Sequence, residues 1–198
     1  MAAQSYLLLF VMDAVSSLIT AGIIYRMIPE TMPEVEEEGA PSSILSTLAG
    51  YRKVFTDRLY MAYILVSMLM LVVYIQMYNT LSVYLRDEHG VSPQGYGFLL
   101  TMSAVTVILL QFWVTRRVKN YPPFLMLALG TAFYMVGFSM YGFVSAYALF
   151  VAAVVLITFG EMIIMPVGQA LAANFAPEDM RGRYLALFSL AWALPATV

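Results

Sequence analysis

An all-α integral membrane protein with six transmembrane helices is the fold class that this 198-residue sequence predicts. Hydrophobic residues make up 62% of the chain and charged residues 11%, against roughly 45–50% and about 25% in soluble domains. The mean hydropathy is +0.81. Several charge-free stretches are long enough to cross a hydrocarbon core of about 30 Å. They are continuously apolar rather than alternating, which favours helices over a β-barrel.

The same composition excludes several classes of function. A net charge of -2 leaves no basic footprint for a nucleic acid. The chain has no cysteine and one histidine, His89, so it lacks thiolate and histidine clusters for a metal. It also lacks the G-x-x-x-x-G-K-[ST] phosphate loop and the H-E-x-x-H zinc motif. We therefore expect neither a cofactor nor enzyme activity.

Gaps between charges define the expected spans, which are residues 4–26, 59–84, 94–115, 122–141, 146–173 and 184–198. The uncharged run 120–160 would form roughly 60 Å of helix, enough for two crossings with a turn near Gly142 and Ser145. The last segment would reach only about 22 Å, less than the core thickness. We therefore expect a fragment of a longer protein or one half of a split protein.

Basic residues are distributed unevenly between the predicted spans. Alternating crossings leave Arg86 alone on one side and place the remaining Lys and Arg residues on the other: Arg26, Arg52, Lys53, Arg58, Arg116, Arg117, Lys119, Arg181 and Arg183. Because basic residues near span ends mark the cytoplasm, the expected location is a plasma or inner membrane with the loop 27–57 cytoplasmic.

The loop 27–57 has two parts. It contains an acidic cluster that is typical of a solvated linker, made of Glu34, Glu36, Glu37 and Glu38. Apolar residues then recur at helical spacing, namely Ile44, Leu48, Tyr51 and Phe55. A short amphipathic helix is predicted there, either lying on the inner membrane surface or packing against the bundle.

Glu161 is the strongest candidate for a functional residue. It falls near the middle of the predicted helix 146–173, where a carboxylate must be neutralised, paired or turned towards a water-filled cavity. A carboxyl that is neutral part of the time can take up and release a proton, as a proton-coupled carrier requires. Pro166 lacks a backbone N–H and leaves the Met162 carbonyl without its helical donor. Such breaks occur where helices line a cavity, although a packing role for Glu161 is the alternative.

Further polar residues lie within the predicted spans. Asp13 is a second candidate for proton coupling. Amides and hydroxyls in spans serve as ligand contacts or as interhelical hydrogen bonds. The candidates for a substrate cavity are Tyr74, Gln76, Tyr78, Asn79, Gln111 and Gln169.

Two stretches near the end of the chain resemble a known family. The run from Gly160 to Leu171 has the pattern Gly-Glu…Pro-x-x-Gln, and residues 177–183 read Pro-Glu-Asp-Met-Arg-Gly-Arg. They look like helix ten and the following loop of major facilitator superfamily carriers, and are similar to the bacterial drug/proton antiporter branch. The first segment, with Ile28-Pro29-Glu30-Thr31, looks like helix six entering the central loop.

One family signature is degraded. The loop between helices eight and nine in the family often reads G-x-x-x-D-R-x-G-R-R. This chain keeps Arg116 and Lys119 but lacks both glycines and the aspartate. An aspartate-based charge lock is therefore not expected, while Arg181 and Arg183 complete the cytoplasmic motif.

The resemblance implies helices 6–11 of a twelve-helix bundle. Residues 1–26 would be the last helix of the N-terminal bundle, 27–57 the central cytoplasmic loop and 58–198 an incomplete C-terminal bundle. The implied function is secondary active transport, with proton-coupled export of small amphipathic molecules by alternating access. The implied partners are membrane lipid, a small-molecule substrate, protons and the missing N-terminal helices, from the same or a split protein. A proton-coupled nutrient uptake carrier and a non-transporting membrane scaffold or sensor subunit remain alternatives.

Overall fold

The computed structural model describes residues 2–27 and 44–193, whose regular elements are all helices. The chain divides into two units, residues 1–42 and 43–198, which are described separately. The described part of the first unit is α1 (Ala2–Met27). The second unit contains α2 (Ile44–Thr56), α3 (Arg58–Asn79), α4 (Leu81–His89), α5 (Pro93–Val118), α6 (Pro123–Phe143), α7 (Tyr147–Phe175), the 3-10 turn η1 (Glu178–Met180) and α8 (Arg181–Ala193).

The predicted all-α membrane fold is confirmed. Among the described residues, five helices are long and apolar enough to cross a membrane: α1, α3, α5, α6 and α7. The turn expected near Gly142 and Ser145 lies between the end of α6 at Phe143 and the start of α7 at Tyr147. The sixth predicted segment, 184–198, coincides with α8 as far as Ala193, and its last five residues lie outside the described part. The acidic cluster at residues 34–38 also lies outside it.

The prediction of one uninterrupted helix over residues 59–84 is wrong. The helix is interrupted at Thr80, which ends α3 and precedes α4. The Met77 carbonyl, which a continuous helix would pair within its own backbone, accepts a hydrogen bond from the Tyr96 hydroxyl of α5. The Thr80 hydroxyl donates to Oε1 of Gln76. A contact from a neighbouring helix thus accompanies an interruption that apolar composition alone cannot indicate.

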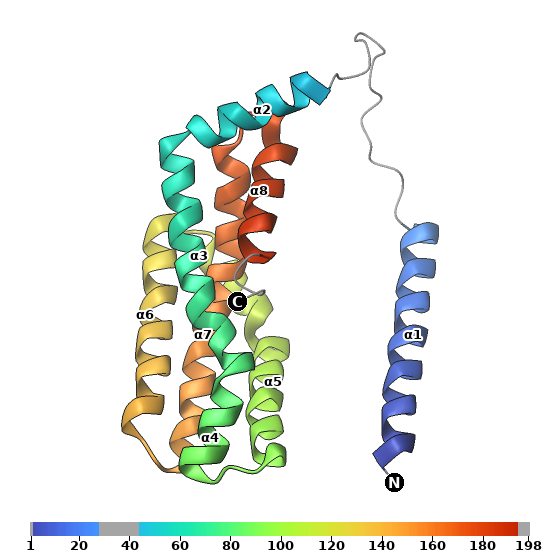
Figure 1. Ribbon diagram of the computed structural model, residues 1–198, viewed down its shortest axis with the longest axis vertical. Helices are drawn as coiled ribbons and strands as arrows, with labels where there is room; N and C mark the ends of the chain where they lie inside the picture. Colours follow the sequence, from blue (N-terminus) through green and yellow to red (C-terminus); the bar gives the residue numbers. More distant parts are fainter. Residues whose placement is uncertain (1, 28–43, 194–198) are drawn as a thin grey trace. The chain divides into compact units, whose positions relative to one another are not determined.

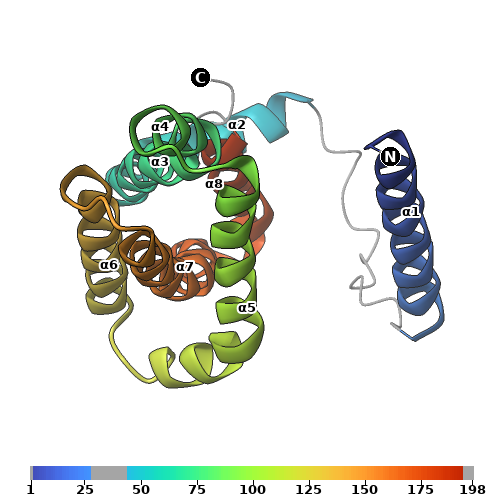
Figure 2. The same ribbon diagram turned by 90° about the horizontal axis from the view of Figure 1, so that it is seen from below.

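The helices of the second unit run back and forth between two ends (Figure 1). The α2 helix lies across one end, and the α4–α5 and α6–α7 connections lie at the other (Figure 1). Figure 2 shows α7 between α5 and α6. The α7 helix also carries the longest set of buried side chains, so it forms the centre of this unit.

Glycines bring α6 and α7 into close contact. A Cβ atom added to Gly160 would lie 2.6 Å from Cδ1 of Tyr134 and 2.8 Å from the Gly130 carbonyl oxygen. A Cβ atom at Gly137 would lie 2.6 Å from Cγ1 of Ile157. Small residues of this kind let helix backbones approach closely where lipid provides no hydrophobic driving force.

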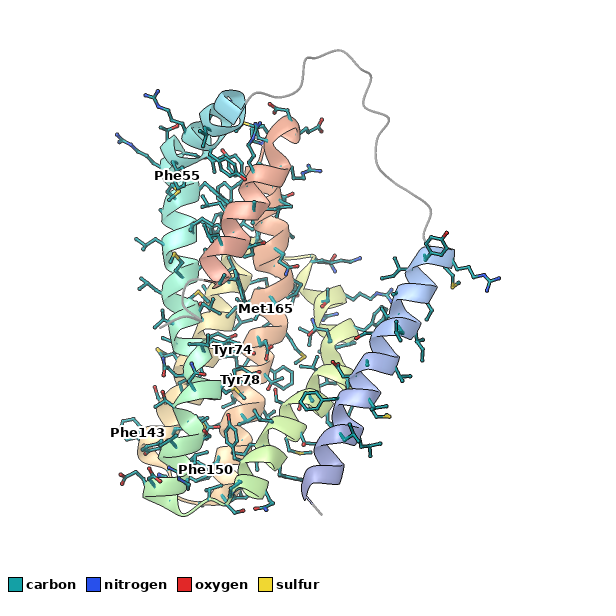
Figure 3. The ribbon with its side chains drawn as sticks, turned by 45° about the vertical axis from the view of Figure 1, so that its right-hand side comes forward. Phe55, Tyr74, Tyr78, Phe143, Phe150 and Met165 are labelled. Carbon is teal, nitrogen blue, oxygen red and sulfur yellow. The ribbon has the colours of Figure 1, made fainter. Side chains whose placement is uncertain are left out.

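The predicted short helix of the central loop is α2, and it packs against the bundle. Val54 is fully buried among residues of α3 and α8. The Arg183 guanidinium group occupies the space beside Gly50, where an added Cβ atom would lie 2.5 Å from Cζ. Phe55 is exposed at this end of the unit (Figure 3). Packing therefore accounts for one face of α2, and a membrane-surface role for its exposed face remains a prediction.

Candidate functional site

Glu161 lies in the middle of α7 and is half-buried. Its carboxyl group lies near the side chain of Tyr74, which α3 contributes. Figure 3 shows Tyr74 and Met165 at middle depth in the bundle, between Phe55 at one end and Phe150 at the other. The acid is therefore placed far from both ends of the spanning helices.

Tyr74 of α3 and Tyr134 of α6 lie near this carboxyl group, and Tyr78 of α3 lies beside Tyr74. The hydroxyls of Tyr74 and Tyr78 lie 3.1 Å apart, and their rings meet edge to face with centroids 5.7 Å apart. The Tyr74 ring also stacks on Tyr134 of α6, with centroids 5.7 Å apart and an interplanar angle of 13°. Tyr74 and Tyr134 are buried, whereas Tyr78 is 49% exposed. The arrangement places the acid near two buried tyrosines, one of which contacts the half-exposed Tyr78.

Sequence reasoning missed Tyr134, although a signal for it exists. Gly130, Tyr134, Gly137 and Tyr141 follow one another at spacings of four, three and four residues and are all buried. This row is the face of α6 that packs on α7. The spacing of these four residues predicts one buried face of a helix, and Tyr134 lies on that face.

No basic partner for Glu161 is found in the described part of the chain. The one salt bridge found there joins Arg86 to Asp87, at 2.7 Å, in the short helix α4. A charge held at middle depth is costly unless it is paired, hydrated or neutralised. Hydroxyl groups rather than a cation are therefore the neighbours that the described structure offers to this carboxyl group.

Pro166 lies inside α7, which is continuous from Tyr147 to Phe175, and a side chain of another helix donates to the carbonyl that the proline leaves without its helical donor. The proline lies inside α7 and the Met162 carbonyl lies four residues before it. Nε2 of Gln111 on α5 donates to that carbonyl oxygen at 3.3 Å and to Oγ1 of Thr115 at 2.8 Å. The structure thus places the Gln111 amide at the Met162 carbonyl, and Met162 is the residue after Glu161.

The other polar candidates are not gathered at this point. Gln76 donates to the Val72 carbonyl of its own helix at 3.3 Å and is exposed. Asn79 and Gln169 are exposed. Asp13 is exposed on α1 and is described only with that unit. Their roles as substrate contacts or proton sites remain predictions.

The predicted cytoplasmic motif is divided between two helix ends. Arg116 and Lys119 line a shallow hollow at the end of α5, together with Phe112 and Thr115. Arg183 lies against Gly50 of α2. One carboxylate of this region is engaged with a neighbouring helix, since Oδ2 of Asp57 accepts a hydrogen bond from the Tyr184 hydroxyl at 3.0 Å. The two halves of the motif therefore have different surroundings.

Apart from the shallow hollow at the end of α5, the bundle has a cavity with an apolar lining. It measures about 380 Å³ and lies between α3, α6, α7 and α8, with Tyr74 and Tyr134 in its wall. Tyr74 and Tyr134 therefore belong both to the wall of this apolar cavity and to the surroundings of Glu161.

The arrangement is that of a multi-pass helical membrane protein with a polar centre inside its spans. The sequence matches the Major Facilitator Superfamily over residues 1–198. The chain belongs to this family, whose members include transporters.

Two curated relatives are similar to the chain. A protein of Planococcus maritimus named as a Na(+), Li(+), K(+)/H(+) antiporter is 22% identical over 179 residues, which are 83% of this chain and 42% of that protein. An uncharacterized MFS-type transporter of Bacillus subtilis (strain 168), YttB, is 30% identical over 113 residues, which are 56% of this chain and 28% of that protein. The chain thus covers less than half the length of either relative.

Proposed function

We propose that this chain forms part of a proton-coupled secondary transporter of the plasma or inner membrane, with the central loop in the cytoplasm. Its cargo would be small amphipathic molecules, exported by alternating access. The observation that carries the proposal is Glu161, a half-buried carboxyl group at middle depth, near the side chain of Tyr74 and with no cation beside it in the described residues. A group in these surroundings suits reversible protonation.

The neighbouring hydroxyls suit both charge states of the acid. A tyrosine hydroxyl can donate to a carboxylate and can accept from a protonated carboxyl group. Tyr74 can therefore remain a partner of Glu161 when the proton is bound and when it is released. Tyr78, which meets Tyr74 at 3.1 Å, connects this pair to the exposed side of α3.

The site favours neutral or cationic cargo. Inside the bundle Glu161 lies among aromatic and apolar side chains. Among the described residues it has no basic partner. A specific second candidate is exchange of a monovalent metal cation for protons, which the name of the Planococcus maritimus relative as a Na(+), Li(+), K(+)/H(+) antiporter favours. Both candidates need the same carboxyl group.

The test uses the native protein in the form that its cell produces. Antiport is measured after reconstitution in proteoliposomes with an imposed pH gradient. A fluorescent lipophilic cation and, separately, Na⁺ or K⁺ serve as cargo. Glu161→Gln should reduce proton-driven exchange at least tenfold and remove its pH dependence. Glu88→Gln is the matched control, because Glu88 is an exposed glutamate of the short helix α4.

The outcomes separate the alternatives. An unchanged pH profile in Glu161→Gln would refute the assignment of the proton site. Cargo that crosses in the same direction as the protons in oriented vesicles would favour an uptake carrier, whereas cargo that crosses against the protons would favour the exporter. Absence of any substrate-dependent flux, with one stoichiometric protein partner in the purified sample, would favour the scaffold or sensor alternative.

A further inference from the structure

The side chain of Gln111 makes two hydrogen bonds that fix its orientation. It lies half-buried on α5 and donates to Oγ1 of Thr115 at 2.8 Å and to the backbone carbonyl of Met162 at 3.3 Å. An amide nitrogen carries two hydrogens, so both bonds form together. A backbone carbonyl only accepts, so the nitrogen rather than the oxygen of the amide must face Met162.

The Met162 carbonyl needs a donor from outside its helix. In an α-helix it would receive the N–H of residue 166, but residue 166 is proline and has none. Met162 is only 1% exposed, so water does not replace the missing donor easily. A buried carbonyl without a partner is unfavourable, and the unsatisfied group weakens the structure around it. The amide of Gln111 occupies the place of the absent backbone N–H.

The residues just before Pro166 on α7 contact three other helices. Gln111 of α5 binds Met162, Tyr74 of α3 lies near Glu161, and α6 packs tightly against Gly160. The three consecutive residues 160–162 thus each have a different helix as their neighbour. These contacts constrain the segment of α7 that carries Glu161, where Pro166 removes one of the hydrogen bonds of the helix backbone.

We infer that Gln111 is a positioning residue for Glu161: its amide replaces the donor that Pro166 removes and ties the acid-bearing turn of α7 to α5. Gln111 touches neither the carboxyl group nor a substrate in this role. Its effect on transport rests on the proposed function, whereas its effect on the carboxyl group can be measured without transport.

The measurement is the pH dependence with which a carbodiimide labels Glu161 in membranes that contain the native protein. Carbodiimides react with protonated carboxyl groups in apolar surroundings, and mass spectrometry of the peptide containing residue 161 quantifies the product. The titratable groups near Glu161 are Tyr74 of α3 and Tyr134 of α6, and Tyr78 of α3 contacts the Tyr74 hydroxyl. All three tyrosines stay unchanged in the variants.

Gln111→Met removes the donor and keeps the length of the side chain. It should move the labelling midpoint by about half a pH unit or more. Pro166→Ala restores the backbone N–H to the Met162 carbonyl, so Gln111→Met in that background should move the midpoint no further. Thr106→Val is the control, because Thr106 is half-buried on the same helix but donates to Met102 of its own backbone at 2.7 Å.

The double-variant cycle decides the inference. The inference would be overturned if Gln111→Met moved the labelling midpoint equally with Pro166 and with Pro166→Ala. It would also be overturned if Gln111→Met did not move the midpoint when Pro166 is present. If Gln111→Met fails to accumulate in the membrane, Pro166→Ala must rescue it, and failure of the double variant to accumulate would also overturn the inference. A failure of the proposed function would show in a different experiment, as antiport that Glu161→Gln leaves unaltered. The labelling of Glu161 in the Gln111 and Pro166 variants does not depend on that result.

Discussion

The rings of Tyr74 on α3 and Tyr134 on α6 stack with their centroids 5.7 Å apart, directly beside the acid of α7. Stacked aromatic pairs contribute about 0.5–1.5 kcal/mol beyond the area that they bury. Stacking of the ring therefore orients Tyr74, and its hydroxyl remains available for contacts with Tyr78 and with Glu161 nearby. Ring and hydroxyl of Tyr74 have separable roles.

This separation gives a prediction for Tyr74→Phe. The phenylalanine keeps the stack and removes the hydroxyl that contacts Tyr78 and lies near Glu161, so folding should change by no more than about 1 kcal/mol. The pH profile of exchange should nevertheless shift by about half a pH unit or more, because the acid loses its hydroxyl partner. Proteoliposome exchange measured across the pH range tests it.

Tyr147→Phe is the matched control for this change. The Tyr147 hydroxyl donates to the Gly95 carbonyl at 2.8 Å, at the end of the bundle where α7 begins. Its removal should leave the pH profile unchanged. Equal profiles for Tyr74→Phe and the unaltered protein would contradict the role given to the hydroxyl.

The contact between α6 and α7 gives a prediction for Gly160→Ala. A methyl group there would lie 2.6 Å from Tyr134 and 2.8 Å from the Gly130 carbonyl oxygen, and backbone cannot move as easily as a flexible side chain. Overpacking of this kind costs typically about 1–3 kcal/mol. The melting temperature of the purified protein in detergent should fall.

Gly142→Ala provides the comparison. An added methyl group at Gly142 meets nothing within 4 Å, and alanine is the better helix former by up to about 1 kcal/mol. This variant should melt at the same temperature as the unaltered protein or above it. Equal destabilisation by the two alanines would show that the helices do not approach as closely as described.

The position of Glu161 inside a spanning helix could be predicted, because a charge within a long apolar stretch is visible along the chain itself. The sequence also predicted that Pro166 would leave the Met162 carbonyl without a donor, because that follows from helix geometry. It could not predict that Gln111 supplies the replacement, since Gln111 is 51 residues away and only packing brings α5 to α7. The identity of a partner across helices depends on tertiary contacts, not on spacing.

The interruption at Thr80 shows the same limit in the backbone. Residues 59–84 are apolar enough for one helix, and no proline or glycine marks a break among them. The Tyr96 hydroxyl donates to the Met77 carbonyl from another helix. Composition predicted the span, while the position of the break required knowledge of what lies beside it.

The start of α3 gives a prediction for Asp57. Its Oδ1 atom accepts from the Tyr60 backbone N–H at 3.1 Å and caps the helix, while Oδ2 accepts from the Tyr184 hydroxyl at 3.0 Å. Asp57→Ala removes both bonds and should destabilise the protein by about 1–2 kcal/mol. Asp57→Asn retains an oxygen for the cap and should cost less. Chemical unfolding in detergent ranks the two, and a larger loss for the asparagine would contradict the cap.

A buried pair of hydroxyls joins α5 to α7 and gives the last prediction. Thr158 is fully buried, and its oxygen lies 2.8 Å from Oγ of Ser103 and 2.8 Å from the Val154 carbonyl oxygen. The single hydroxyl proton of Thr158 can be given to only one of them, and the carbonyl cannot donate in return. Thr158 therefore donates to Val154, and Ser103 donates to Thr158.

This direction makes the two single substitutions unequal. Thr158→Val leaves the buried Ser103 hydroxyl without its acceptor and should cost about 1–3 kcal/mol, whereas Ser103→Ala leaves the Thr158–Val154 bond intact and should cost about 1 kcal/mol. The double variant has no orphaned hydroxyl, so its loss of stability should be smaller than the sum of the two by about 1 kcal/mol. Unfolding free energies of the four proteins in detergent measure this coupling. Strict additivity, or a larger loss from Ser103→Ala than from Thr158→Val, would mean that the hydroxyl of Ser103 does not depend on Thr158, and that α5 and α7 are held together at this level by apolar packing alone.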